Sequence, residues 1–326
     1  MIAVPERLVR FIQDHDSFVI AGHKEPDGDC IGSCLAMASF LRRMGKQVQL
    51  VSAGPFKRIE IREYEPLFAA AAVPEALSGS ACALILDCSN AGRTGDAAPS
   101  FEGLPHAIID HHATNDASGP VDFVESASPA TTLLVQSIIE AIAGSVTPEE
   151  AELLFFGLCT DTGFFRHLDE KSAESFACAS RLVAAGANPK KTFARMNGGK
   201  SYESRILVAR ILTRMKRWYD GKLVISWENL EDTQEFGLEG RDSDILYQLI
   251  QSIAGVEAIV IVRQETETNC TVGFRSLDRV DVSIVASAFG GGGHRQASGL
   301  SVAGTIDELI PRFVESFAPQ FPGVEP

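Results

Sequence analysis

The chain has 326 residues, which is too long for one ordinary hydrophobic core, so we expect two domains. Its 45% hydrophobic and 22% charged residues are typical of a soluble globular protein. The net charge of −14 argues against binding of long nucleic acid, which usually needs a basic surface, but leaves small phosphorylated ligands open. No apolar run approaches a membrane span and the N-terminus lacks a signal-peptide pattern, so we expect a cytoplasmic protein with no membrane partner.

The seven cysteines agree with that location. Their number is odd, no two of them form a CxxC pair, and most lie among apolar residues. These features predict free thiols in the core rather than disulfides or a cysteine metal site. The cysteines are at positions 30, 34, 82, 88, 159, 178 and 270.

The first half of the chain alternates strand-like and helix-like segments. Short apolar runs predict strands at 17–21, 47–52, 83–87, 106–110 and 121–125. Apolar residues at helical spacing predict helices at 5–14, 30–44, 129–143, 148–160 and 171–185. This alternation predicts an α/β domain whose mostly parallel sheet is flanked by helices.

Turn-forming residues at 184–201, which include Asn-Pro and Asn-Gly-Gly, mark a domain boundary. We expect a first domain at 1–187, a linker with a connecting helix at 188–218, and a smaller α/β domain at 219–326. The elements expected beyond the boundary are helices at 201–218, 243–252 and 305–318, strands at 222–227, 256–264 and 269–275, and a glycine-rich loop at 290–293.

Acidic and histidine side chains follow the first predicted strand. The segment GHKEPDGDCIG carries His23, Asp27 and Asp29 just before the helix at 30–44. This is the carboxyl end of a strand, where open α/β sheets build their sites. Crowded carboxylates repel one another unless a cation joins them, which favours a metal. Aspartate as the cap of the next helix is the alternative for this segment taken alone.

The pattern recurs three more times along the chain. ALILD ends in Asp87, HAIID runs into the DHH triplet at 110–112, and GLCTDTG puts Asp161 at a helix end, where the helix dipole opposes a carboxylate. The ligands that these segments supply are His23, Asp27, Asp29, Asp87, His111 and Asp161. Six oxygen and nitrogen ligands suit two adjacent ions better than one tetrahedral zinc. They favour Mn²⁺, with Mg²⁺, Fe²⁺ or Co²⁺ as alternatives, and a shared hydroxide for phosphoryl chemistry.

The motifs HKEPDGD, Asp87 after its strand, DHH at 110–112, DTG at 161–163 and GGGHRQASG at 291–299 together resemble the DHH phosphoesterase superfamily. More narrowly, the chain resembles its DHH/DHHA1 subgroup of NrnA-like oligoribonucleases (nanoRNases) and pAp phosphatases. The resemblance covers nearly the whole chain. It implies a DHH catalytic domain at 1–187 and a DHHA1 substrate-binding domain at 219–326.

The resemblance also implies roles for individual residues. One metal would take His23, Asp27 and Asp87, and the other Asp29, Asp87, His111 and Asp161, so that Asp87 bridges the two. His112 would face the scissile phosphate, and Asp110 would orient an imidazole. The anion-binding residues expected in the second domain are Gly292, Gly293, His294, Arg295 and Arg275. Arg93 and Arg166 lie next to metal motifs, where each would contact either a phosphate or a surface carboxylate.

The expected activity is hydrolysis of short 5′-phosphorylated oligoribonucleotides to mononucleotides, together with release of phosphate from adenosine 3′,5′-bisphosphate (pAp). The alternative substrates are cyclic di-AMP and its linear product pApA, which need the same metals and anion loop. A RecJ-like exonuclease fits less well because the chain is short and acidic. An inorganic pyrophosphatase fits less well because of the GGGH loop, and a non-catalytic nucleotide sensor because all six ligands are present. The family further suggests a homodimer.

Overall fold

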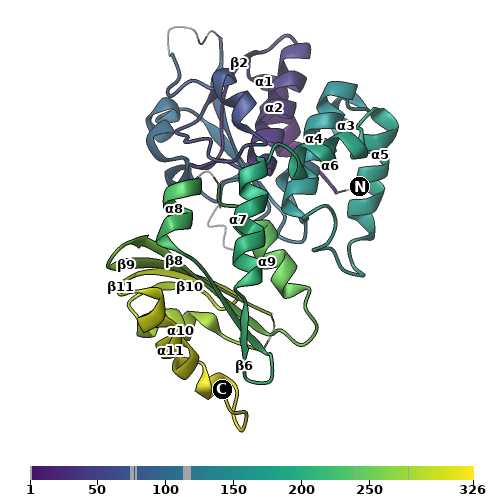
Figure 1. Ribbon diagram of the computed structural model, residues 1–326. Coiled ribbons are helices and arrows are strands. Elements are labelled where there is room, and N and C mark those ends of the chain that lie inside the picture. The colour runs from purple at the N-terminus through teal and green to yellow at the C-terminus, as the bar shows by residue number, and fades with distance from the viewer. Residues whose placement is uncertain (1, 74–76, 78, 113–118, 239, 278) are drawn as a thin grey trace. The chain divides into compact units, whose positions relative to one another are not determined.

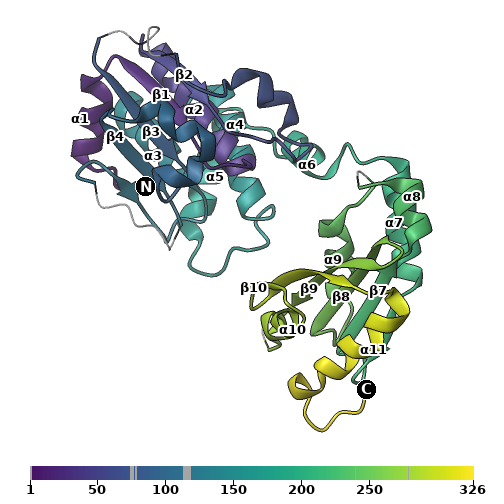
Figure 2. The same ribbon diagram turned by 90° about the vertical axis from the view of Figure 1, so that its left-hand side faces the viewer.

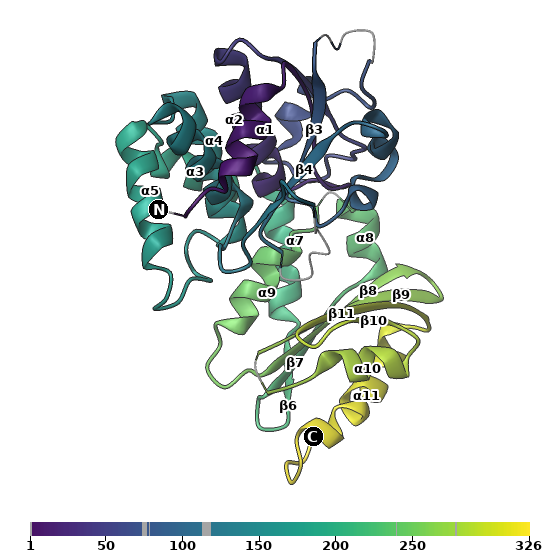
Figure 3. The ribbon, with the colours of Figure 1, turned by 180° about the vertical axis from the view of Figure 1, so that it is seen from behind.

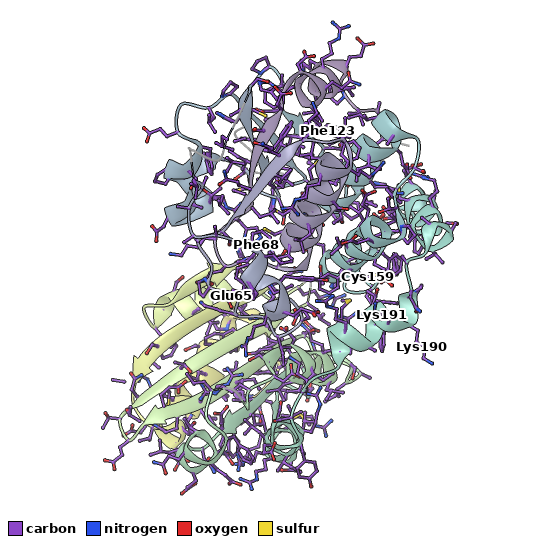
Figure 4. All side chains as sticks on the ribbon, turned by 90° about the horizontal axis from the view of Figure 1, so that it is seen from above. Glu65, Phe68, Phe123, Cys159, Lys190 and Lys191 are labelled. Carbon is purple, nitrogen blue, oxygen red and sulfur yellow. The ribbon has the colours of Figure 1, made fainter. Side chains whose placement is uncertain are left out.

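The computed structural model describes residues 2–73, 77, 79–112, 119–238, 240–277 and 279–326 (Figure 1). The chain divides into two compact units, which we call unit 1 (Met1–Gly199) and unit 2 (Lys200–Pro326). No helix in the described residues combines the length and the apolar character that crossing a bilayer requires. All seven cysteines are buried and free, as expected, and one of them, Cys159, is labelled in Figure 4.

Unit 1 is built on a five-stranded parallel sheet with the strand order β2-β1-β3-β4-β5. Its strands are β1 (Ser17–Ala21), β2 (Gln47–Val51), β3 (Ala81–Leu86), β4 (His106–Asp110) and β5 (Phe123–Val124). Strands β1 and β3 are almost entirely apolar and buried, as expected for a sheet that is covered on both faces. The α/β class and each strand expected in this part of the chain are therefore confirmed.

Six α-helices belong to unit 1, among its described residues: α1 (Glu6–Asp14), α2 (Gly28–Arg43), α3 (Thr131–Ala143), α4 (Pro148–Asp161), α5 (Ala173–Ala185) and α6 (Pro189–Asn197). Buried side chains of α1 to α5 pack with one face of the sheet, and Figure 3 shows α3, α4 and α5 gathered on one side of the unit. The other face packs against the 3₁₀ segment η3 (Ala91–Phe101); a second 3₁₀ segment, η1, spans Arg62–Leu67.

Unit 2 contains a six-stranded sheet with the order β10-β11-β9-β8-β7-β6, in which only β7 and β8 pair in parallel among the described strands (Figure 2). The strands are β6 (Lys216–Trp218), β7 (Leu223–Glu228), β8 (Ala258–Thr266), β9 (Asn269–Ser276), β10 (Gly292–His294) and β11 (Ala297–Ala303). The helices are α7 (Tyr202–Thr213), α8 (Leu230–Phe236), α9 (Ser243–Gln251), α10 (Val282–Ala288), α11 (Ile306–Ser316) and the 3₁₀ turn η4 (Ala318–Gln320). Side chains of α7 and α9 pack on one face of the sheet, and those of α10 and α11 pack on the other.

Two expectations for the second half are wrong. The helix expected at 201–218 ends at Thr213, because Lys216–Trp218 pairs with β7 instead of continuing the helix. The glycine run expected as a loop enters a hairpin, in which Gly292–His294 pairs with β11. Both cases are short strands, for which pairing with a neighbour outweighs the local preference of the residues.

Two glycines let α2 and α4 approach closely, and these helices carry two of the expected metal ligands. A methyl group on Gly32 of α2 would lie 2.6 Å from the carbonyl oxygen of Leu153 in α4. A methyl group on Gly157 of α4 would lie 3.1 Å from the Cα atom of Asp29. Backbone contact at this crossing therefore fixes the start of α2, with Asp29, against the last turns of α4, which ends at Asp161.

We predict that Gly32→Ala destabilises unit 1, because its methyl group meets a backbone carbonyl that cannot rotate away. Overpacking of this kind costs about 1–3 kcal/mol, which exceeds the gain of about 1 kcal/mol from replacing a helical glycine with alanine. Thermal unfolding measured by circular dichroism checks the effect. Ser39→Ala, on the partly exposed side of the same helix, is the matched control. A higher melting temperature for Gly32→Ala would show that the helices can separate freely.

Candidate metal centre

The strand order of unit 1 brings the expected ligands to one edge of its sheet. β1, β3 and β4 are parallel neighbours, so their carboxyl ends lie side by side. His23 follows β1, Asp87 follows β3, and His111 follows β4. The start of α2 and the end of α4 add the other ligands to this group, which we call the metal centre: His23, Asp27, Asp29, Asp87, His111 and Asp161.

Asp87 lies between the two histidines of the metal centre. One carboxylate oxygen of Asp87 is 3.5 Å from Nε2 of His23, and the other is 3.5 Å from Nε2 of His111. His23 Nε2 is also 3.7 Å from Asp27, and His111 Nε2 is 3.2 Å from Asp161. A carboxylate with one oxygen toward each histidine has the geometry that a bridging ligand needs. Bridging itself stays a prediction.

Asp29 is fully buried and held by the N-terminus of α3. Its two oxygens accept backbone hydrogen bonds from Thr131, at 2.6 Å, and from Thr132, at 3.0 Å. The Thr131 hydroxyl donates to Asp87 at 3.0 Å. These threonines support the metal centre, and sequence reasoning missed them. Hydroxyl residues that open an apolar helix were the one available signal, because helix N-termini bind anions.

The backbone at Asp87 is strained. Its φ of 54° lies in the left-handed region, which non-glycine residues seldom adopt outside functional sites and turns. Strand β3 ends at Leu86, so this conformation turns the Asp87 side chain out of the strand at the carboxyl edge of the sheet. Asp27, in contrast, also serves as the helix cap considered from sequence, since its side chain accepts the backbone N–H groups of Asp29 and Cys30.

The metal centre strongly favours added positive charge. Burial lowers the pKa of His23, but the neighbouring carboxylates outweigh burial and raise it to about 12. Burial also lowers the pKa of His111, but the carboxylates around it, Asp161 first among them, outweigh burial and raise the pKa to about 9. Burial raises the pKa of Asp29 well above its usual value, and the negative charges of Asp87 and Asp161 add to the effect. A cation held here would relieve the mutual repulsion of these carboxylates.

The histidines are oriented as metal ligands usually are. Nδ1 of His23 lies 2.9 Å from the carbonyl oxygen of Lys24, and Nδ1 of His111 lies 3.2 Å from that of Ser128. Each ring therefore turns its Nε2 toward the carboxylates. Nε2 of His111 is buried and makes no hydrogen bond to any described residue, although Asp161 lies 3.2 Å away. An unsatisfied imidazole nitrogen among carboxylates fits a divalent cation.

His112 is oriented differently from His111. Its Nδ1 is 2.7 Å from a carboxylate oxygen of the buried Asp110, and its ring is about one-third exposed. The hydrogen bond with Asp110 raises the pKa of His112 above its usual value. His112 thus presents its second nitrogen, Nε2, away from Asp110. This arrangement agrees with the expected roles in the DHH triplet, in which Asp110 supports His112, His111 is a ligand and His112 contacts the substrate. These roles stay predictions.

In unit 2, the register of the sheet aligns two of the expected anion-binding residues. Arg275 of β9 pairs with Ala297 of β11, and Ala297 pairs with His294 of β10. Residues that are directly opposite point to the same face, so Arg275 and His294 share one face of the sheet. The Arg275 guanidinium lies 4.7 Å from the Tyr247 ring centre, on the side of α9.

The remaining expected anion-binding residues of unit 2 do not all lie on the same face of the sheet. Gly292 alternates with Gly293 along β10, so Gly292 is on the face of His294 and Gly293 is on the opposite one. Arg295 lies just beyond the strand, and its guanidinium donates weakly to the Arg279 carbonyl, at 3.5 Å. Gly292 is therefore better placed than Gly293 or Arg295 to act together with His294.

Arg93 and Arg166 are both exposed at the carboxyl edge of the unit 1 sheet. The Arg93 side chain donates to the Ser89 hydroxyl at 3.4 Å, and the Arg166 side chain donates to the Gly163 carbonyl at 2.9 Å. Neither forms an ion pair with a described carboxylate. Of the two alternatives considered from sequence, contact with a phosphate therefore remains open for both.

A parallel sheet with clustered aspartate and histidine side chains at its carboxyl edge, followed by a unit with a mixed sheet, is the arrangement of a two-domain phosphoesterase. Residues 17–158 match the N-terminal domain of the DHH family, and residues 220–320 match the DHHA1 domain. The chain belongs to the DHH/DHHA1 family. The family resemblance expected from the motifs is therefore confirmed.

Named relatives agree with this assignment. The chain is 30% identical over 302 residues to the bifunctional oligoribonuclease and PAP phosphatase NrnA of Thermus thermophilus. The aligned region covers 91% of this chain and 88% of that protein. It is 24% identical to the cyclic-di-AMP phosphodiesterase GdpP of Bacillus subtilis, of which it spans 50%. An exopolyphosphatase-related protein from Bacteroides fragilis shares the fold, with a TM-score of 0.80 and 21% identity over 98% of this chain and 99% of that one.

We predict that Asp87→Ala lowers the number of bound divalent ions per chain and abolishes turnover, since its carboxylate is the only one within 4 Å of both histidines among the described residues. Plasma emission spectrometry of the protein dialysed against Mn²⁺ measures the ions. Glu102→Ala, an exposed change in the same unit, is the control. Full occupancy and full activity in Asp87→Ala would exclude Asp87 as a ligand.

Proposed function

We propose that this protein hydrolyses short 5′-phosphorylated oligoribonucleotides to mononucleotides and converts pAp to AMP, with two divalent ions at the metal centre. The observation that carries the proposal is Asp87, buried between two histidines, together with the unsatisfied Nε2 of His111. The similarity to NrnA, which is named for both activities, extends over both units. Two further relatives with that name, from Streptococcus mutans and Mycoplasma pneumoniae, support the same substrates.

We assign the ligands as the family motifs suggest. One ion would be held by His23, Asp27 and Asp87, and the other by Asp29, Asp87, His111 and Asp161. Among the described residues, the ligand atoms that lie close enough together to share an ion fall into three groups: His23 with Cys30 and Asp87, Asp87 with His111 and His112, and Asp29 with His111 and Asp161. These groups support the assignment in part, since they hold five of the six proposed ligands but not Asp27. Hard carboxylate oxygens with two imidazoles favour Mn²⁺ over softer ions. Two such ions supply Lewis-acid activation of the phosphate and a lowered pKa of water.

The chain's own residues would perform the remaining steps. Asp110 holds the His112 ring in one orientation and stabilises its protonated form. His112 is thus suited to donate a hydrogen bond, or a proton, to the phosphate oxygens or to the leaving oxygen. Thr131 keeps Asp87 in place through its hydroxyl. In unit 2, the face that carries Arg275 and His294 would bind an anionic group of a nucleotide.

Cyclic di-AMP or pApA is the second candidate substrate class. The similarity to GdpP favours it, because GdpP is named for that activity and aligns with 96% of this chain. The identity is lower than with NrnA, however, and the chain spans only half of that protein. Oligoribonucleotides and pAp are therefore the better supported substrates. A homodimer and a cytoplasmic location remain proposals from the family resemblance.

We predict that EDTA abolishes the activity, that Mn²⁺ restores it, and that RNA of two to five nucleotides is cut faster per molecule than a 24-mer. An acidic chain gains little binding energy from additional phosphates, and this chain has 43 acidic residues but only 29 basic ones. Product analysis by denaturing gels or chromatography, with pAp, pApA, cyclic di-AMP and pyrophosphate in parallel, ranks the substrates. A clear preference for the 24-mer would favour a long-substrate exonuclease instead.

We predict that His112→Ala lowers kcat by about 10²–10⁴-fold while the protein keeps its metal, because the residue is proposed to act on the phosphate and not on the ions. His106→Ala, an exposed histidine at the start of β4, is the matched control. Kinetics and metal analysis are performed on the same preparations. If the metal content halves while the rate per bound ion is normal, His112 is a ligand and the division of the triplet is wrong.

A further inference from the structure

The thiol of Cys30 lies among the ligand atoms of the metal centre. Cys30 directly follows Asp29 in the first turn of α2 and is buried. Its Sγ atom, a ring nitrogen of His23 and a carboxylate oxygen of Asp87 all lie within 4.8 Å of one another. Bonds of about 2.0–2.3 Å place two ligands of one ion roughly 3–4 Å apart. Small adjustments therefore allow these three atoms to share an ion.

The absence of a side chain on Gly22 gives the Cys30 thiol its place. A methyl group on Gly22 would lie 2.1 Å from Sγ of Cys30 and 3.2 Å from the carbonyl oxygen of Leu86. Gly22 directly precedes His23, and Leu86 directly precedes Asp87. The thiol therefore lies where the carboxyl ends of β1 and β3 meet, next to the residues that carry both other ligands.

The ion beside His23 has room for a further donor. The proposed assignment gives this ion three protein ligands, His23, Asp27 and Asp87, whereas the other ion has four. In addition, Oδ1 of Asp27 already accepts the backbone N–H groups of Asp29 and Cys30, both at 3.1 Å, as the cap of α2. A thiol at Cys30 would raise the number of protein ligands of this ion to four, the usual number for zinc and similar ions.

Two neighbouring cysteines do not share the position of Cys30. Cys34 lies one turn further along α2, and its Sγ would be 3.5 Å from a methyl group on Gly22 instead of 2.1 Å. Cys88 directly follows Asp87, but its thiol donates to the carbonyl oxygen of Asn90 at 3.1 Å. In the described part of the chain, Cys30 is the only cysteine in a group of atoms that could hold an ion.

We propose that Cys30 is a fourth ligand of the ion beside His23, and that this position prefers Zn²⁺, Co²⁺ or Fe²⁺ to Mn²⁺. The ion replaces the thiol proton, which passes to the solvent, and thiolate sulfur is a soft donor that suits these ions better than manganese. The position that includes His111 has no thiol among its possible ligand atoms in the described residues, so it keeps the preference for hard ions.

The metal centre then holds two unlike ions. This inference rests on the two-ion site of the proposed function and adds to it a difference between the two positions. It also departs from the expectation that all seven cysteines serve only the core.

Cobalt tests the sulfur ligand directly, because a thiolate bound to Co²⁺ gives a near-ultraviolet charge-transfer band that oxygen and nitrogen ligands do not give. Metal-free wild-type protein titrated with Co²⁺ is expected to develop this band. Cys30→Ser is expected to bind Co²⁺ without the band. Cys34→Ser and Cys88→Ser are the matched controls and should keep it. Circular dichroism checks that each variant is folded.

Metal exchange tests the difference between the two positions. Wild-type protein loaded with Co²⁺ and dialysed against Mn²⁺ is expected to exchange one ion readily and to retain the other, whereas Cys30→Ser exchanges both. The Mn²⁺ concentration that removes the retained ion should fall by about 10- to 100-fold in Cys30→Ser, the range by which changes around metal ligands alter affinity. Plasma emission spectrometry counts both ions.

The proposal is overturned if the Co²⁺-loaded wild type shows no sulfur band, or if Cys30→Ser keeps the band. If Cys30→Ser does not fold, X-ray absorption of the Zn²⁺-loaded double variant Cys34→Ser/Cys88→Ser decides: a sulfur neighbour of the ion supports Cys30, and its absence rejects Cys30. Ions bound without sulfur would reject this inference alone. A wild type that binds no divalent ion would reject the proposed function as well.

Discussion

The buried carboxylate of Asp87 is the constraint on which unit 1 depends. It is 2% exposed, and a charge in such a place requires partners of opposite charge and hydrogen-bond donors. His23 and His111 approach it from both sides, and Thr131 donates to it. These partners come from three different elements, so strand order and helix packing have to be correct before the charge is compensated. Fold and metal centre are therefore specified together.

The same requirement explains the glycines and the strain around the centre. Gly32 and Gly157 let α2 and α4 touch, which carries Asp29 to the N-terminus of α3. The left-handed backbone of Asp87 costs about 1–3 kcal/mol, and surrounding contacts must outweigh that cost. A structure that only needed stability could have used apolar residues at these points. The retained strain and buried charge indicate a site that is built to bind a cation.

The sequence predicted which side chains gather at the carboxyl edge of the sheet better than it predicted the residues that support them, and the role of these side chains as ligands stays a prediction. Each ligand directly follows an apolar run or opens a helix, and parallel strands bring such positions to one edge, so local pattern and topology were sufficient. Thr131 meets Asp29 across 102 positions of the chain, and the hydroxyl residues that open the apolar helix were the one local signal of such a contact. The strand Gly292–His294 was missed because glycine has a low strand propensity, and pairing with β11 decides its conformation.

Charge also limits which substrates such a protein can select. With a net charge of −14, the chain as a whole repels polyanions, so attraction has to come from the bound ions and from individual cations beside them. Each of these contacts acts over a few ångströms, because the surrounding solution screens longer interactions. A phosphate at the ions and a small number of individual cations would then provide most of the electrostatic binding energy. Further phosphates would add length without adding attraction, and this is how an acidic phosphoesterase can prefer short nucleotides.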